Sequence, residues 1–222
     1  MRHEETEWID YYEKNAKHYS NAAEESKKGS VINALELVNP GVVLDFGGNV
    51  GTYSRLASQR GAYCISCDID PLCVHGNYEA AHHEKNPRIL PLLLDLTNPT
   101  PALGFAIDER SNFIERAKPD LVMALALLHH LRITGNIPIY NLAAFLAQLS
   151  PYVLIEYVPK TDVMAQALLR SRRDIFSDYT DAGFHEAFAA HFDIESSFPI
   201  AQTERTLYLF KRRLNRWRTS VV

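Results

Sequence analysis

The sequence predicts an α/β, Rossmann-like fold in which the strands of a mostly parallel sheet alternate with helices that cover both of its faces. Three observations lead to this prediction. Short apolar runs alternate with segments of helical spacing, the first run passes into a glycine-rich turn, and 222 residues suit one domain with a full core. Short apolar runs with helices between them are typical of buried parallel strands.

Strands are expected at the apolar runs, with two further strands closing the chain. We place them at residues 42–46, 63–68, 88–94, 121–125, 152–156, 192–198 and 206–211. Helices are expected between them, at residues 52–60, 71–84 and 140–149, and before them, at residues 8–15 and 22–38. No linker or repeat interrupts this pattern, so we expect a single domain over residues 1–222, with 1–40 as a helical cap or lid and 41–222 as the core.

The composition is that of an average globular protein, with 46% hydrophobic and 23% charged residues. It excludes a disordered chain, a collagen-like chain and a small disulfide scaffold. Three cysteines, an odd number, fit a reducing compartment better than a disulfide framework. No apolar stretch approaches the roughly 18 residues of a membrane span, and residues 1–10 are too polar for a signal peptide. We therefore expect a cytoplasmic protein with no membrane partner.

Charge is unevenly distributed along the chain. Residues 1–204 carry 17 basic and 27 acidic side chains, a net charge of −10, whereas the rest of the chain has no acidic residue. The six basic residues of this tail are Arg205, Lys211, Arg212, Arg213, Arg216 and Arg218. An acidic body disfavours a large polyanionic partner such as nucleic acid. The tail is expected to be a solvated helical end, with nucleic-acid contact as the minority alternative.

The glycine-rich turn at residues 47–51 is the strongest sign of a ligand. In an open α/β sheet, ligands bind outside the carboxyl ends of the strands, and glycines let the backbone approach them closely. A dinucleotide would require Gly-x-Gly-x-x-Gly, but Asn49 stands at the middle glycine position and Thr52 at the last. Asp45, two residues before the first glycine, would repel a pyrophosphate but suits a cationic ligand.

Acidic residues also follow the next two predicted strands. Asp68 ends the second strand, where a carboxylate accepts hydrogen bonds from ribose hydroxyls. Asp95 ends the third strand and is placed to accept a hydrogen bond from the amino group of an adenine. Ile69 and Leu96, the residues directly after them, can supply apolar walls.

With these three acidic positions in register, the chain resembles the class I S-adenosylmethionine-dependent methyltransferases. Their pattern, acidic-x-Gly-x-Gly-x-Gly followed by acids after strands two and three, is matched at Asp45, Gly47, Gly51, Asp68 and Asp95, with Asn49 as a tolerated departure. Phrases at residues 7–12, 94–104, 124–131, 155–160 and 204–209 narrow the resemblance to a bacterial subfamily that includes the methyltransferase domain of a host-specific nodulation protein.

The resemblance implies a seven-stranded sheet with the last strand antiparallel. It also implies S-adenosylmethionine as cofactor, S-adenosylhomocysteine as product, and no metal. The implied cofactor contacts are Asp45, Gly47, Asn49, Gly51, Asp68, Ile69, Asp95 and Leu96. Tyr19, in an aromatic N-terminal segment, could place its hydroxyl or ring beside the methionine moiety, although simple packing of the first helix is the competing interpretation.

Catalytic candidates follow the fourth and fifth strands, where an acceptor would meet the methyl group. His129 or His130 could act as a general base near neutral pH, with His129 favoured because it is nearer the end of the strand, or the pair could simply stabilise the turn. Glu156 could bind an amine or hydroxyl of the acceptor, or make a structural hydrogen bond beneath it. The long segment at 98–115 is expected to be a substrate-side loop that presents Arg110.

Cys64 and Cys67, with Cys73 and His75 nearby, raise the question of a zinc site. Residues three apart on a strand point to opposite faces, so we expect no metal there, nor at His82 and His83 on a polar helix end.

The sequence therefore predicts methyl transfer from S-adenosylmethionine to a small-molecule acceptor. Three alternatives stay open: an RNA, DNA or protein methyltransferase, a non-catalytic S-adenosylmethionine-binding protein and, least favoured, an NAD-dependent oxidoreductase.

Overall fold

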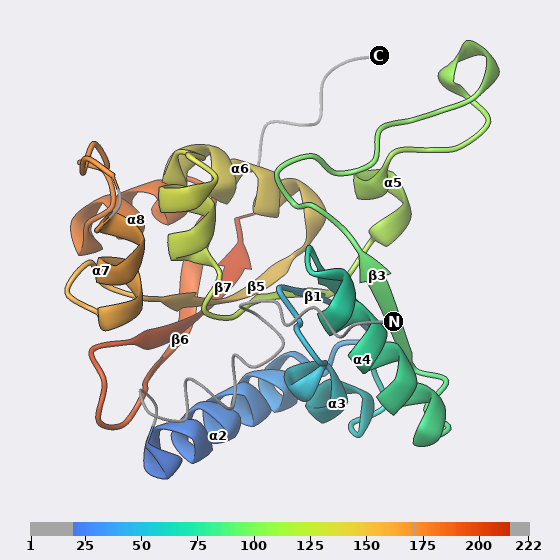
Figure 1. Cartoon of the computed structure of the whole chain (residues 1–222), viewed down its shortest axis with the longest axis horizontal. Coiled ribbons are helices and arrows are strands. Elements are labelled where there is room, and N and C mark those ends of the chain that lie inside the picture. Colours follow the sequence, from blue (N-terminus) through green and yellow to red (C-terminus); the bar gives the residue numbers. More distant parts are fainter. Residues whose placement is uncertain (1–19, 171, 214–222) are drawn as a thin grey trace.

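A seven-stranded sheet forms the centre of the computed structural model, which describes residues 20–170 and 172–213 (Figure 1). The strand order is β3-β2-β1-β4-β5-β7-β6. The first five strands pair in parallel, and β7 is antiparallel to both of its neighbours, β5 and β6. The predicted fold class is confirmed, including the antiparallel last strand.

The strands lie close to the predicted ranges and differ from them by at most one residue at either end. They are β1 (Val42–Phe46), β2 (Tyr63–Asp68), β3 (Ile89–Leu93), β4 (Leu121–Ala124), β5 (Tyr152–Tyr157), β6 (Phe192–Pro199) and β7 (Thr206–Arg212). The helices are α2 (Asn21–Val38), α3 (Thr52–Ser58), α4 (Pro71–His83), α5 (Phe113–Ala117), α6 (Ile139–Leu149), α7 (Val163–Leu169) and α8 (Asp181–Ala189). The predicted helix at 8–15 and Tyr19 lie outside the described residues.

Helices cover both faces of the sheet, as the alternation of side chains along each strand requires. On one face, Leu44 and Phe46 of β1 pack with buried residues of α5, α6, α7 and α8. On the other face, Val43 packs with buried residues of α2 and α3. Figure 1 shows the two groups of helices on opposite sides of the strands.

The ligand position expected for this topology lies between β1 and β4. The chain runs from β1 outward to β2 and β3, then returns to β4 on the other side of β1. The connections therefore diverge at the carboxyl ends of β1 and β4, which leaves a crevice where open α/β sheets bind their ligands.

Two predicted segments differ from expectation. The loop after β3 forms an isolated bridge between Leu103 and Arg110, with a short 3₁₀ helix (Phe105–Ile107) at its tip, and projects away from the sheet (Figure 1). The described part of the basic tail is no solvated helical end, because Lys211 and Arg212 belong to β7. Arg213 pairs with Asp193 on the neighbouring strand at 2.8 Å.

Within the described ranges, no helix is long and apolar enough to cross a membrane.

Candidate functional site

A cavity opens at the carboxyl ends of β1, β2 and β4, with a volume of about 460 Å³. That volume lies within the usual range for small-molecule sites. Seven of the eight residues expected to contact the cofactor line it: Asp45, Gly47, Asn49, Asp68, Ile69, Asp95 and Leu96. The eighth, Gly51, lies at the start of α3 and shapes the turn instead.

The glycine turn is folded against the end of β2. The backbone N–H groups of Gly47 and Gly48 both donate to the carbonyl of Cys67, at 2.9 and 3.0 Å. Gly51 has φ +82°, and a Cβ there would lie 2.2 Å from the Asn77 side-chain oxygen. Only glycine fits that position, because the conformation is left-handed and the space is already filled.

Asn49 explains how the turn tolerates a departure from the glycine pattern. Its φ of +48° lies in the left-handed region, which asparagine enters more readily than most residues. Its side-chain oxygen accepts a hydrogen bond of 2.7 Å from the N–H of Val50. A short polar side chain is thus accommodated in a left-handed conformation where the common pattern has glycine.

Asp45 lies almost wholly buried beneath this turn. Its carboxylate accepts a hydrogen bond of 2.6 Å from the hydroxyl of Ser54 on α3. Burial raises the pKa of Asp45 to about 6, although the Ser54 hydrogen bond opposes the rise. A cation bound in the cavity would favour the ionised form of this carboxyl group.

Asp68 and Asp95 are oriented by backbone hydrogen bonds. Asp68 accepts from the N–H groups of Asn49 and Asp70, both at 2.9 Å, and burial is the main cause of its raised pKa. Asp95 accepts from the N–H and the hydroxyl of Thr97, at 2.8 and 2.7 Å. A carboxylate has about four acceptor positions, so both groups can also accept from a ligand.

Another part of the cavity wall comes from a π-helix, His130–Thr134, in the segment after β4. His130, Leu131 and Thr134 of this helix line the cavity. Arg132 anchors the helix from outside: its guanidinium donates to Asp178 at 2.6 Å and lies 4.6 Å from the ring centre of Phe176. π-Helices are rare in proteins, and those that do occur often lie at functional sites.

The two candidate histidines are placed differently. His130 lines the cavity, and burial, followed by the charge of Arg205, lowers its pKa to about 4. His129 is fully buried and is not among the lining residues. Neither ring nitrogen of His129 has a hydrogen-bond partner within the described part of the chain, and burial holds its pKa well below the usual value. Both rings are neutral at pH 7, and His130 is the one that a ligand can reach.

Glu156 is completely buried beneath the cavity and is not among its lining residues. It lies 2.7 Å from the Lys27 ammonium and 3.2 Å from the Arg205 guanidinium. Burial alone would raise the pKa of Glu156, but these two cations outweigh it and lower the pKa. Arg205 also pairs with Asp162, the N-cap residue of α7, at 2.7 Å.

Lys27 and Arg205 line the cavity, and sequence reasoning missed both. Lys27 belongs to no recognisable sequence motif within the predicted helix at 22–38. Arg205 was assigned to the basic tail, but it is only 4% exposed and belongs to this ion-pair network. Its nearness in sequence to the last strand could have indicated a position beside β5.

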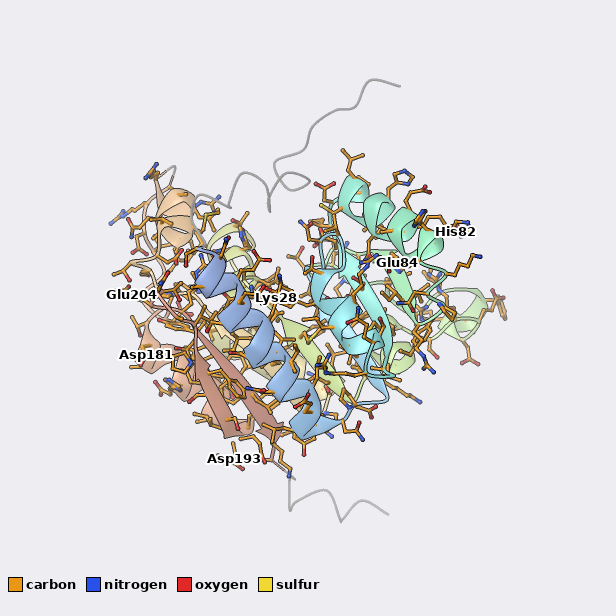
Figure 2. All side chains as sticks on the ribbon, turned by 90° about the horizontal axis from the view of Figure 1, so that it is seen from below. Lys28, His82, Glu84, Asp181, Asp193 and Glu204 are labelled. Atoms are coloured by element: carbon orange, nitrogen blue, oxygen red, sulfur yellow. The ribbon has the colours of Figure 1, made fainter. Side chains whose placement is uncertain are left out.

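The remaining candidates lie elsewhere. Cys64 and Cys67 pack on opposite faces of the sheet, as strand alternation predicted. His82 lies at the end of α4, on the outside of the molecule (Figure 2). Arg110 is exposed and does not line the cavity, so the expected substrate-side position of its loop is not observed. Residues 20–170 and 172–213 contain no cluster of three or more potential metal ligands.

Comparison with known proteins identifies one curated relative and a set of similar folds. No family model matches the chain. The nodulation protein NoeA of Rhizobium meliloti is 35% identical over 195 residues, which cover 86% of this chain and 40% of the relative. The chain thus spans about two fifths of the length of this relative.

Two solved structures illustrate the shared fold. The N-methyltransferase NodS of Bradyrhizobium japonicum has a TM-score of 0.65 at 8% identity, covering 88% of this chain and 99% of NodS. The magnesium protoporphyrin IX methyltransferase of Synechocystis, solved with bound S-adenosylmethionine, has a TM-score of 0.59 at 17% identity, covering 94% and 86%. The chain therefore has the Rossmann-like fold seen in these methyltransferases.

Proposed function

We propose that the protein transfers a methyl group from S-adenosylmethionine to a small-molecule acceptor. The observation that carries the proposal is the placement of Asp45, Asp68 and Asp95 along a single cavity, each at the carboxyl end of a different strand. The similarity to NoeA and the fold shared with NodS support it.

The lining residues fit this cofactor chemically. Asp68 would accept hydrogen bonds from the ribose hydroxyls and Asp95 from the adenine amino group, with Ile69 and Leu96 against the base. Gly47 and Asn49 would hold the backbone close to the methionine moiety. When bound, S-adenosylmethionine supplies a methyl group on a positively charged sulfur, and the carboxylates of this cavity favour such a cation.

His130 is our candidate for proton transfer, ahead of His129, because it lines the cavity. With a pKa of about 4, its imidazole is neutral at pH 7 and can accept a hydrogen bond from an acceptor hydroxyl, although this pKa makes it a weak base. A purely structural role in the π-helix is the competing possibility. Glu156, first considered as an acceptor contact, is better placed to hold Lys27 and Arg205.

A small-molecule acceptor fits better than a nucleic acid. Residues 1–204 carry a net charge of −10, which disfavours a polyanionic partner. Two of the basic side chains at the end of β7 already bind other groups of the protein: Arg213 pairs with Asp193, and Arg212 donates to the carbonyl of Ala147. We also propose a cytoplasmic location, which is consistent with the three free, buried cysteines.

Titration calorimetry with S-adenosylmethionine tests the cofactor assignment. Replacing Asp68 with alanine removes the ribose acceptor, so we expect affinity to fall about 10- to 100-fold. Unchanged affinity would sink the ribose assignment. Formation of S-adenosylhomocysteine with a panel of small acceptors then separates an enzyme from a protein that only binds the cofactor.

A further inference from the structure

Two basic side chains of the described residues line the cavity close to its carboxylates, Lys27 from α2 and Arg205 just before β7. Their surroundings differ. The Arg205 guanidinium donates to both carboxylate oxygens of Asp162, at 2.7 and 2.8 Å, and to Glu156 at 3.2 Å. This two-pronged pairing is the geometry that a guanidinium uses to bind a carboxylate, and here a protein carboxylate supplies it.

Lys27 occupies a different position. Its ammonium lies 2.7 Å from Glu156 and 4.9 Å from the ring centre of Tyr53, in the first turn of α3. Lys27 and Asp45 line the same cavity, and the charge of Lys27 acts to lower the pKa of Asp45. An ammonium group has three N–H donors, so pairing with a protein carboxylate is compatible with binding a ligand.

The order of the strands gives the cavity a direction. Asp95 follows β3, Asp68 ends β2, and the glycine turn follows β1, so these groups succeed one another across the sheet. An adenine at Asp95 and a ribose at Asp68 direct the rest of the cofactor towards the glycine turn. The amino-acid part of S-adenosylmethionine, with one ammonium and one carboxylate, would then lie between Asp45 and Lys27.

We infer that Lys27 binds the carboxylate of the methionine moiety of S-adenosylmethionine and that Glu156 is the residue that positions Lys27. The inference rests on the proposed function and assigns one end of the cofactor to a particular side chain. It also gives α2 a role in recognition, since Lys27 comes from that helix.

Glu156 is required in this scheme because Lys27 is only 8% exposed. A buried cation without a partner is strongly disfavoured, because it has lost its hydration. Glu156, fully buried at the end of β5, pairs with the Lys27 ammonium and fixes its position at the cavity wall. Glu156 thus acts through Lys27 and need not contact the ligand.

The test compares three ligands by titration calorimetry on the full chain. S-adenosylmethionine has the carboxylate, decarboxylated S-adenosylmethionine lacks only that group, and 5′-methylthioadenosine lacks the whole amino-acid part. We expect wild type to bind S-adenosylmethionine about 10- to 100-fold more tightly than the decarboxylated form. Lys27→Met should abolish this preference while changing affinity for the other two ligands less than about threefold.

Matched variants separate a specific effect from a general one. Lys28→Met removes the neighbouring lysine of α2 (labelled in Figure 2), whose partly exposed ammonium pairs with Glu24 and Glu25, and should leave all three affinities unchanged. Glu156→Gln should reduce the preference for the carboxylate, although Lys27 is retained. If Lys27→Met does not fold, the double variant Lys27→Met/Glu156→Gln replaces it, because that variant leaves neither partner charged.

The outcomes distinguish this inference from the proposed function. If wild type binds none of the three ligands, the proposed function fails. If it binds S-adenosylmethionine and the decarboxylated form equally, the function stands and the inference is overturned. A Lys27 variant that weakens all three ligands by the same factor also overturns it, since the lysine would then support the whole site and not the carboxylate.

Discussion

The cavity joins two regions that are held together by different means. The turn side comprises residues 45–51, 68–70 and 95–97, where hydrogen bonds from side chains to other described residues span 1 to 19 positions, as between Asn49 and Val50 and between Asp68 and Asn49. The charged side comprises Lys27, Glu156, Asp162 and Arg205, and the bonds that Arg205 makes there span 43 and 49 positions. The turn side is shaped by local backbone geometry, whereas the charged side depends on distant elements meeting correctly.

This difference has an energetic consequence. A turn is fixed by conformational preferences that each contribute modestly, so single changes there should be tolerated or moderately costly. A buried ion-pair network is tightly interdependent, because removal of one member leaves the others charged and poorly solvated. Mutations on the charged side should therefore destabilise the protein more than mutations on the turn side.

The largest effect is expected for Glu156→Ala. It removes the carboxylate that faces both Lys27 and Arg205, so the free energy of unfolding should fall by about 3–5 kcal/mol. Urea denaturation followed by circular dichroism measures it. The control, Lys28→Ala, breaks only partly exposed pairs and should cost less than about 1 kcal/mol. Similar costs for the two variants would contradict the contrast between the two sides.

A smaller loss of stability is expected for Gly51→Ala on the turn side. The left-handed φ of +82° and the nearby Asn77 side chain should lower the free energy of unfolding by about 2 kcal/mol. Gly29→Ala is its matched control, because Gly29 lies inside α2 and no atom of the described residues comes within 4 Å of the added Cβ. At Gly29 the same change should raise the free energy of unfolding by about 1 kcal/mol. A lower free energy of unfolding for Gly29→Ala would contradict the explanation by backbone conformation and available space.

The pH dependence of ligand affinity probes Asp45. Because the pKa of Asp45 is raised to about 6, its ionised fraction increases from pH 5 to pH 7.5. Affinity for S-adenosylmethionine should rise over this range, on the order of tenfold, and level off above it. Asp45→Asn should flatten this profile, as calorimetry at several pH values would reveal. A fall in affinity with rising pH would refute the assignment.

The same pKa shift affects folding in the opposite direction. A carboxyl group with a raised pKa binds its proton more tightly in the folded state than in the unfolded chain. The stability that Asp45 contributes is therefore complete below about pH 4 and is lost as the pH rises through about 6. Ligand affinity and fold stability should thus respond oppositely to pH at this residue.

The smallest effect is expected for Asn49→Gly, which restores the glycine of the common pattern. The left-handed backbone is acceptable to both residues, and the lost hydrogen bond to Val50 is local. Thermal unfolding should show a stability change below about 1 kcal/mol, and calorimetry an unchanged affinity. A large change would show that the Asn49 side chain has a role beyond the turn.

The same contrast explains what the sequence could and could not reveal. Asp45, Asp68 and Asp95 were predictable because each follows an apolar run, and parallel strands bring such ends to one edge of the sheet. Lys27 was not, because its partner Glu156 is brought to it only by tertiary packing. A charged residue in an amphipathic helix is normally solvated, so nothing local indicates that it is buried.

The π-helix at His130–Thr134 was missed for a related reason. Its apolar residues fit an ordinary helix or turn, and the clamp from Asp178 on Arg132 comes from a segment 46 residues later. The sequence therefore located the two histidines at the edge of the sheet, but nearness to the strand end favoured His129, whereas His130 is the one that lines the cavity.

The position of β7 between β5 and β6 has a consequence for the newly made protein. β6 is synthesised before β7, yet within the described sheet it pairs only with β7, and Arg205 lies just before that strand. While the ribosome still holds residues 205–212, Glu156 therefore lacks one of its two cations and the sheet lacks its antiparallel edge. Nascent chains shorter than this should be open to proteases and unable to complete the cavity wall, so the site matures only when the last strand is released.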